Sequence, residues 1–194
     1  MSRRKTHQMV RTARVLMFAL AVTAIGSAGI VYLRWLFREQ AYNHTIEQMS
    51  AKYGVDKFLI KAVIRRESKF DPLSYGSHGE IGLMQVMPGT GQQWARAVGR
   101  RDFGKDSLWL PSVNIEVGTW YLARALAHWQ NMDDPVPFAL AEYNAGPGNV
   151  QRWISQGNAT NAQQFADAIT YPGVRHYIEA ITDYYQAYQA AGSL

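Results

Sequence analysis

Apolar residues recur every three to four positions in several segments of the chain, and few segments alternate between apolar and polar at a period of two. The first pattern is typical of amphipathic helices and the second of half-buried strands. In one long segment, Ile115, Leu122, Leu126 and Trp129 lie on roughly one helical face. The pattern therefore predicts a mainly α-helical protein in which strands are a minor component.

Capping and turn residues set the expected ends of these helices. Gly54 is a C-terminal stop, Asp56 is an N-cap, and Asp71-Pro72 ends the helix that Asp56 begins. The residues 74–79 are too rich in glycine and serine for regular structure, and we expect them to form a loop that lines a cleft. The expected helices, the first of which reads equally as a linker, cover residues 39–49, 56–67, 90–98 behind Thr90, 112–129 behind Ser112, 138–143 and 174–190.

The N-terminal region contains a long apolar run. Residues 15–33 hold no charged side chain, and a helix of this length is able to cross the hydrocarbon core of a membrane. Five basic residues precede the run, so the positive-inside rule places the N-terminus in the cytoplasm. We therefore predict a basic cytoplasmic segment over 1–14 and a transmembrane signal anchor over 15–37.

A cleaved signal peptide is the alternative for this region. The small residues 26–29 are of the kind that a signal peptidase accepts. The apolar run continues through Leu33 after them and is longer than a usual signal-peptide core, which favours the uncleaved anchor.

The charge of the chain is concentrated at this N-terminus. Of twenty Lys and Arg, seven lie at or before Arg38, whereas all fifteen Asp and Glu lie after it, so the remainder carries 13 minus 15, or −2. The basic balance is therefore a topology signal, and nucleic-acid binding is not expected. The chain has no cysteine, which excludes a lipid anchor on cysteine and disulfides, and its five histidines lack ligand spacing, so no metal site is predicted.

Glu67 is the strongest candidate for chemistry. On a helical wheel Ile60 lies about 20° from it, Val63 about 40° and Ile64 about 60°, which places Glu67 within the core-facing stripe. A carboxyl group there is desolvated, which raises its pKa toward neutrality and equips it as a general acid. The alternative is a partly exposed glutamate at a helix end, paired with a neighbour such as Arg66.

Four blocks of sequence, the first of which contains this glutamate, follow one another along the chain: Glu67-Ser68, Gly82-Leu83-Met84-Gln85, Met87-Pro88-Gly89-Thr90 and Ala141-Glu142-Tyr143-Asn144-Ala145-Gly146. In order and spacing they resemble the soluble lytic transglycosylase (SLT) family. Asn114-Ile115 with Gly118 is similar to the middle helix of that family, so the likeness covers residues 45 to 190. The resemblance implies a mainly α, lysozyme-like domain of the goose-type/SLT kind over 38–194, preceded by the single N-terminal transmembrane helix.

The resemblance also implies an activity on peptidoglycan glycan strands, without a cofactor. In this family a single glutamate, here Glu67, protonates the glycosidic oxygen of a MurNAc–GlcNAc bond and then accepts a proton from the muramoyl 6-hydroxyl, which leaves a 1,6-anhydro end. A hydrolysing goose-type lysozyme and a non-catalytic peptidoglycan-binding scaffold are the alternatives. The expected place is the bacterial inner membrane, with the catalytic domain on the periplasmic or extracellular side and with unidentified cell-envelope machinery as a further partner.

The expected substrate-binding residues are Ser68, Gln85, Met87, Tyr143 and Asn144. The amides of Gln85 and Asn144 suit the hydroxyl and N-acetyl groups of amino sugars, although each could equally tie down a loop. Met87 offers flexible apolar surface to a cleft. Tyr143 matches a family tyrosine whose hydroxyl lies near the acid.

Two loop positions depart from the family pattern. Gly76 stands where the family often has a serine that contacts an N-acetyl group, with Ser77 adjacent, and Glu80 stands where the family commonly has a small residue. We interpret Glu80 as a solvated or locally paired side chain, the alternative being a carboxylate that positions a water for hydrolysis. Near the C-terminus, Gly173-Val174-Arg175-His176-Tyr177 replaces a common Glu-Thr-Arg-x-Tyr pattern, so details of substrate binding are expected to differ.

Overall fold

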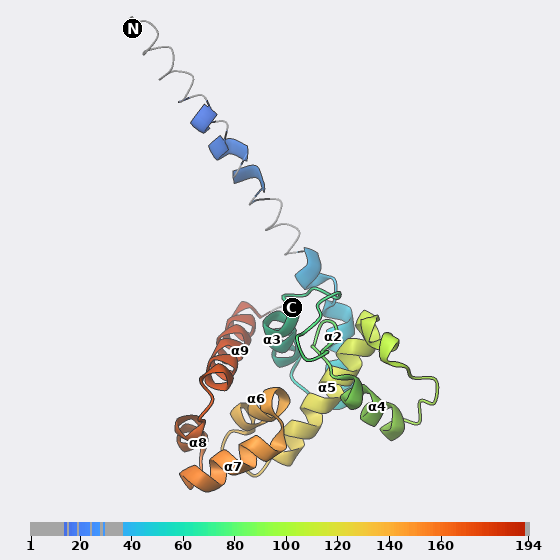
Figure 1. Ribbon diagram of the computed structural model, residues 1–194, viewed down its shortest axis with the longest axis vertical. Coiled ribbons are helices and arrows are strands. Elements are labelled where there is room, and N and C mark those ends of the chain that lie inside the picture. Colours follow the sequence, from blue (N-terminus) through green and yellow to red (C-terminus); the bar gives the residue numbers. More distant parts are fainter. Residues whose placement is uncertain are drawn as a thin grey trace, which may run out of the picture. The chain divides into compact units, whose positions relative to one another are not determined.

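The computed structural model of the protein describes residues 37–192 and, before them, residues 14, 16–18, 20–23, 25–27 and 29. Of the predicted basic segment over 1–14 only Arg14 is described, and of the predicted membrane span over 15–37 residues 15, 19, 24, 28 and 30–36 lie outside the described residues. Among the residues that are described, no helix is both long enough and apolar enough to cross a membrane. The chain divides into a unit over 1–38 and a unit over 39–194, and the helices labelled in Figure 1 belong to the second.

The second unit is mainly helical, as the sequence pattern predicts. In the described part of the chain, extended backbone pairs only as two isolated antiparallel bridges, Tyr75 with Ile81 and Ile81 with Val86. The helices are α2 (Asn43–Tyr53), α3 (Lys57–Ser68), α4 (Pro88–Ala97), the 3₁₀ helix η1 (Lys105–Trp109), α5 (Pro111–His128), α6 (Pro135–Ala145), α7 (Pro147–Gly157), α8 (Ala162–Ala168) and α9 (Pro172–Ala191).

Local rules place the ends of α2 and α3 well. Gly54 ends α2 in the left-handed conformation with φ 69°, where a glycine carries no penalty. Asp56 caps α3 by accepting a hydrogen bond from the Phe58 backbone N–H at 2.8 Å. The expected helix over 56–67 agrees with α3 within one residue at each end, and the helix ends where Lys69 takes φ 52° in the left-handed region, just before Asp71-Pro72.

The expected starts of two helices, at Thr90 and Ser112, are wrong. The helices α4, α5, α6, α7 and α9 each begin at a proline, namely Pro88, Pro111, Pro135, Pro147 and Pro172. Proline suits the first helical position because its missing N–H has no intrahelical partner there and its fixed φ is helical. The helices α4 and α5 therefore start at their prolines, and Thr90 and Ser112 lie within the first turn.

Three helices were not expected from the sequence, namely the 3₁₀ helix η1 and the helices α7 and α8. The helix α7 follows directly after α6, since Gly146 with φ 79° ends one helix and precedes the other. The helix α8 begins where the Asn161 side chain accepts a hydrogen bond from the Gln164 N–H at 2.9 Å. The helix α8 has only seven residues, so its periodicity is a weak signal. The helix α7 is as long as α2 and α6, but it begins at Gly146-Pro147-Gly148, a sequence typical of a turn.

The core forms two clusters that share α5, α6 and α9. In the first, the predicted stripe Ile60, Val63 and Ile64 is fully buried on α3, which packs against α9 and α2. In the second, α6, α7 and α8 bury Phe138, Trp153 and Phe165 together. The helix α9 packs along α3 (Figure 1), which brings residues that lie more than a hundred positions apart in sequence to the end of α3 that carries Glu67.

Candidate active site

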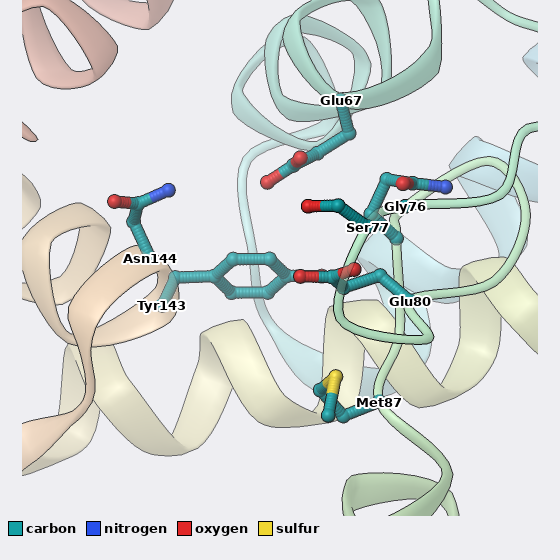
Figure 2. A pocket seen from close by; sticks show the side chains of 8 residues that line it. Glu67, Gly76, Ser77, Glu80, Met87, Tyr143 and Asn144 are labelled. Carbon is teal, nitrogen blue, oxygen red and sulfur yellow. The ribbon is translucent and has the colours of Figure 1, made fainter. Parts of the chain in front are cut away.

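Glu67 lies in the last turn of α3 and its carboxyl group points into a cavity of about 240 Å³. Figure 2 shows the Glu67 side chain entering from α3, with Tyr143 and Asn144 entering from α6. The segment between α3 and α4 closes the cavity from another direction. The lining residues are Glu67, Gly76, Ser77, Glu80, Gln85, Met87, Tyr143 and Asn144.

The carboxyl group of Glu67 has one close polar partner on another helix. The Tyr177 hydroxyl of α9 donates a hydrogen bond to Glu67 Oε1 at 2.6 Å. Burial raises the pKa of Glu67 from its usual 4.5 to about 7, although the Tyr177 hydrogen bond and the charge of Arg66 lower it, while the charge of Glu80 adds to the rise. Glu67 is therefore a carboxyl group that holds or releases a proton near neutral pH, as the sequence predicts for a general acid.

The segment 81–87 is fixed to α5 by hydrogen bonds with the side chain of Asn114. Asn114, fully buried, accepts a hydrogen bond from the Met84 N–H at 2.8 Å and donates to the Ile81 and Leu108 carbonyl oxygens at 2.7 and 2.9 Å. A single side chain thus bonds to two backbone groups of a segment with no regular structure and to one backbone group of η1, which fixes this segment against α5 and η1.

Glycines allow this close approach of the segment to α5. A Cβ atom at Gly82 would lie 2.5 Å from Asn114 Nδ2, and one at Gly118 would lie 2.5 Å from Met84 Sδ. Neither position has room for a side chain, so Asn114 and Gly118 of the middle helix act together to receive Gly82 and Met84. Met84 is fully buried, so it fills the core and not the cavity.

Gln85 ties down the loop, which is one of the two roles that the sequence left open, and its contact with a substrate stays a prediction. Its Nε2 donates to the Ser74 and Gly82 carbonyl oxygens at 3.1 and 2.8 Å, so its amide ties the loop together. The residue also lines the cavity, and its backbone takes φ 47° in the left-handed region that few residues other than glycine adopt. Such strain at a cavity wall is typical of a functional site.

Tyr143, Asn144 and Met87 all line the cavity, as expected. The Tyr143 hydroxyl donates to the Met84 carbonyl oxygen at 2.9 Å, and burial together with the nearby charge of Glu67 raises the pKa of this phenol well above its usual value. Tyr143 therefore stays a neutral donor beside Glu67. Met87 is 42% exposed, so its thioether offers an accessible apolar face.

Glu80 is a cavity-lining carboxylate, in addition to being locally paired. Its Oε2 accepts a hydrogen bond from the His78 backbone N–H at 2.9 Å and its Oε1 lies 3.3 Å from His78 Nδ1. Burial acts to raise the pKa of Glu80, but backbone hydrogen bonds and the adjacent His78 outweigh it and leave this pKa below its usual value. Glu80 is therefore ionised at the pH where Glu67 is still partly protonated.

The structure brings most of the predicted site residues together, with two differences. Ser68 does not line the cavity, and its hydroxyl donates to the Ile64 carbonyl oxygen at 3.2 Å, so its contact with a substrate stays a prediction. Tyr177 was noted only as the tyrosine of an altered C-terminal pattern, although it is the hydrogen-bond partner of Glu67. That pattern retains its tyrosine, which is the signal that could have identified it.

Among the residues that the structure describes, no group of three or more His, Cys, Asp or Glu side chains is placed to hold a metal ion.

These features define a helical protein with one proton-donating carboxyl group in an amide-rich cavity, and comparison with known sequences identifies its family. Residues 44–166 match the model of the Transglycosylase SLT domain. The chain belongs to this family, which confirms the resemblance drawn from the four sequence blocks.

Curated relatives carry the same domain within longer proteins. The soluble lytic murein transglycosylase of Salmonella typhimurium is 31% identical over 146 residues, which is 74% of this chain and 22% of that protein. The membrane-bound lytic murein transglycosylase C of Shigella sonnei is 36% identical over 124 residues, covering 61% of this chain and 34% of the relative. The chain thus matches between about a fifth and a third of the length of these relatives.

Solved structures show the same fold. The lytic transglycosylase Slt of Pseudomonas aeruginosa, determined as an inactive glutamate-to-glutamine mutant, superposes with a TM-score of 0.71 at 28% identity over 78% of this chain and 24% of its own. The 70-kDa soluble lytic transglycosylase of Escherichia coli gives a TM-score of 0.70 at 28% identity over 77% of this chain and 24% of its own. The lysozyme-like, mainly helical class expected from the resemblance is confirmed.

Proposed function

We propose that this protein is a peptidoglycan lytic transglycosylase that cleaves the β-1,4 bond between MurNAc and GlcNAc, with Glu67 as its acid and base. The observation on which the proposal rests is the Glu67 carboxyl group, which faces the cavity with a pKa of about 7 and is held by the Tyr177 hydroxyl. An acid with a pKa near the working pH is well suited to both halves of a proton-transfer cycle. The names of the curated relatives support the substrate class.

In the proposed reaction, protonated Glu67 gives its proton to the glycosidic oxygen as the bond from that oxygen to the muramoyl anomeric carbon breaks. The N-acetyl carbonyl oxygen of the same sugar forms a bond to the anomeric carbon, which yields an oxazolinium ion. The muramoyl 6-hydroxyl then attacks the anomeric carbon, the bond to the N-acetyl oxygen breaks, and the hydroxyl proton passes to the Glu67 carboxylate. Glu67 is thereby reprotonated, and the new end is a 1,6-anhydro sugar.

The neighbours of Glu67 suit this cycle. Tyr177 donates to the carboxyl group and stabilises its ionised form between the two steps, while burial stabilises the protonated form that begins the next turn. Asn144 provides an amide on the cavity wall and Met87 an apolar face. We assign these two residues, together with Gln85 and Tyr143, to binding of the sugar. The Pseudomonas aeruginosa relative is inactive as a glutamate-to-glutamine mutant, which supports a glutamate-dependent reaction here.

Hydrolysis in the manner of a goose-type lysozyme is the second candidate, because Glu80 is an ionised carboxylate on the same cavity. In glycosidases a second carboxylate can activate a water. A non-catalytic peptidoglycan-binding scaffold is less well supported, since binding alone gives no reason for a buried ionisable group.

For the whole chain we propose a single-pass protein of the bacterial inner membrane, with 1–14 in the cytoplasm, 15–37 as the anchor and 38–194 as the catalytic domain outside it. The charge-free run over 15–33 and the basic residues before it support this topology. The relative named a membrane-bound transglycosylase supports an association with the cell envelope. A cleaved signal peptide remains the alternative for the same segment.

Release of soluble muropeptides from isolated sacculi by the purified protein tests the proposal. Glu67→Gln keeps the shape of the side chain and removes the transferable proton, so turnover is expected to fall by about 10²-fold or more. Glu47→Gln on α2 is the matched control, because Glu47 is exposed and pairs with Lys57 away from the cavity, and it is expected to retain wild-type turnover. Equal turnover of wild type and folded Glu67→Gln would refute the role of Glu67, and absence of release by both would favour the scaffold.

A further inference from the structure

Glu80 and Gly76 depart from the family pattern together, and the structure shows why the two departures are coupled. A Cβ atom added at Gly76 would overlap Glu80 Oε2 and would lie 2.9 Å from Gln85 Oε1. The Glu80 carboxylate therefore fills the space that a side chain at position 76 would need. A glycine at 76 is what allows a carboxylate to reach this part of the cavity wall.

Hydrogen bonds within its own loop position the Glu80 carboxylate but leave some of its acceptor positions open. Its Oε2 accepts the His78 N–H at 2.9 Å, and its side chain remains 26% exposed on the cavity. The backbone hydrogen bond of Gly76 to the Glu80 carbonyl oxygen, at 2.9 Å, closes the loop that carries them both. An ionised carboxylate has about four acceptor positions and no donor, so Glu80 retains capacity for a donor from a bound molecule.

The cavity therefore contains two carboxyl groups with different tasks. Glu67 is partly protonated near neutral pH, whereas Glu80 is ionised. The other polar groups that line the cavity are a tyrosine, two amides and the Ser77 hydroxyl, with Arg66 near Glu67 and His78 beside Glu80 as the basic neighbours. Two carboxyl groups whose surroundings push them into opposite protonation states are a recurring sign of divided roles in glycan chemistry. A solvated side chain without function would not need the space left by Gly76.

We propose that Glu80 is a substrate-binding carboxylate that accepts a hydrogen bond from the acetamido N–H of the amino sugar bound beside Glu67. This inference rests on the proposed function. An amide N–H only donates and a carboxylate only accepts, so the two are complementary, whereas sugar hydroxyls are served equally well by the amides of the cavity. A charge-assisted hydrogen bond of this kind is roughly twice as strong as a neutral one.

The contact assists the reaction as well as the binding. As the acetamido oxygen bonds to the anomeric carbon, positive charge develops on the acetamido group, and its N–H becomes a stronger donor to the Glu80 anion. The interaction therefore strengthens in the transition state, which lowers the barrier rather than only KM. The N–H proton stays on the acetamido nitrogen throughout, so Glu67 remains the group that exchanges protons with the substrate.

The test uses the purified protein with a soluble glycan-strand substrate and measures kcat, KM and the pH dependence of kcat/KM for Glu80→Gln. Loss of the charge is expected to lower kcat/KM by about 10-fold, mostly in kcat. In the plot of kcat/KM against pH, the alkaline limb, where activity falls as Glu67 loses its proton, is also expected to move to lower pH in Glu80→Gln. The reason is that the negative charge of Glu80 helps to raise the pKa of Glu67. Arg66, Tyr177 and Tyr143 also face Glu67 and are unchanged in this variant, so the movement of the limb isolates the effect of Glu80.

A paired variant separates charge from packing. Glu80→Ala alone removes both, whereas Gly76→Ser with Glu80→Ala fills the space again and supplies a neutral hydroxyl. The pair is expected to recover part of kcat/KM relative to Glu80→Ala while its alkaline limb stays at the lower pH. Thermal unfolding of each variant verifies that the fold is kept, and Glu47→Gln serves as the charge-matched control on the surface.

Each result supports or overturns the inference. If folded Glu80→Gln, or the paired variant, matches wild type in kcat/KM and in the alkaline limb, then Glu80 has no role in binding the substrate. That result leaves the proposed function intact as long as anhydro ends are still formed. If wild type forms reducing ends and Glu80→Gln abolishes them, Glu80 is a base for hydrolysis, and both the inference and the proposed transglycosylase reaction are wrong.

Discussion

Removal of one hydroxyl group, in Tyr177→Phe, tests how the fold tunes the acid. Tyr177 lies on α9 and its hydroxyl is 2.6 Å from Glu67 Oε1 on α3, so the contact exists only when the two helices are packed together. The Tyr177 ring is 1% exposed and its phenol pKa is raised well above the usual value by burial and by the charge of Glu67. The hydroxyl is therefore a permanent donor that favours the ionised form of Glu67.

The size of the effect follows from this geometry. A hydrogen bond to a charged group contributes about 1.5–3 kcal/mol, and one pKa unit corresponds to about 1.36 kcal/mol. The phenol can also accept a hydrogen bond from protonated Glu67, which offsets part of the difference. Loss of the hydroxyl is therefore expected to raise the pKa of Glu67 by about one. Because the first step needs protonated Glu67, the alkaline limb of kcat/KM moves to higher pH by a similar amount.

The assay is a pH series of kcat/KM on a soluble glycan-strand substrate, with Tyr185→Phe as the control. Tyr185 lies on the same helix and its hydroxyl also donates to a carboxylate, Asp56 Oδ2 at 2.9 Å, but Asp56 caps the far end of α3. The control is expected to keep the wild-type limb. An unchanged limb in Tyr177→Phe, or a movement to lower pH, would refute the assignment of Tyr177 as the group that stabilises ionised Glu67.

Further predictions concern stability, the loop and the N-terminal segment. The pKa of Glu67 is 4.5 in the unfolded chain and about 7 in the folded protein, so ionisation of Glu67 lowers the free energy of unfolding as pH rises through this range. The free energy of unfolding of Glu67→Gln should therefore exceed that of wild type by up to about 3 kcal/mol at pH 8 and should equal it at pH 4. A gain that is the same at both pH values would contradict this. Asn114→Ala removes three hydrogen bonds, with the Met84 N–H and with the Ile81 and Leu108 carbonyl oxygens, although the Ile81 oxygen keeps the Val86 N–H. We expect it to lower the free energy of unfolding by about 2–4 kcal/mol in urea titrations and to reduce turnover; unchanged values would show that the segment 81–87 keeps its conformation without Asn114. A fragment of residues 39–194 keeps the contact between Glu39 Oε1 and the buried Lys61 Nζ, at 3.8 Å, and should cleave isolated wall material on its own. The full chain should fractionate with membranes, whereas release of the protein with a new N-terminus near Gly29 would establish a cleaved signal peptide instead.

Local periodicity was sufficient to predict the helix that carries the acid. The stripe Ile60, Val63 and Ile64 is buried as expected, and Glu67 follows it at the same helical angle, so its desolvation could be inferred without a structure. The cap at Asp56 was equally predictable, because capping depends on residues within one turn.

Contacts between distant residues were beyond the sequence. Tyr177 and Glu67 are 110 positions apart, and their hydrogen bond depends on the packing of α9 against α3. The overlap of Glu80 with the space above Gly76 depends on the path of an irregular loop, which no periodicity describes. The two departures from the family pattern were visible separately, but only the loop geometry joins them.

The nature of the new glycan end tests the central claim most directly. Sacculi digested by the purified protein in heavy-oxygen water are analysed by mass spectrometry. With Glu67 as the one carboxyl group that exchanges protons, the substrate's own 6-hydroxyl is delivered at high effective concentration and should outcompete water. The account predicts muropeptides lighter by one water than their hydrolysed counterparts, with no heavy oxygen and no new reducing sugar. Reducing muramic ends that contain heavy oxygen would contradict it.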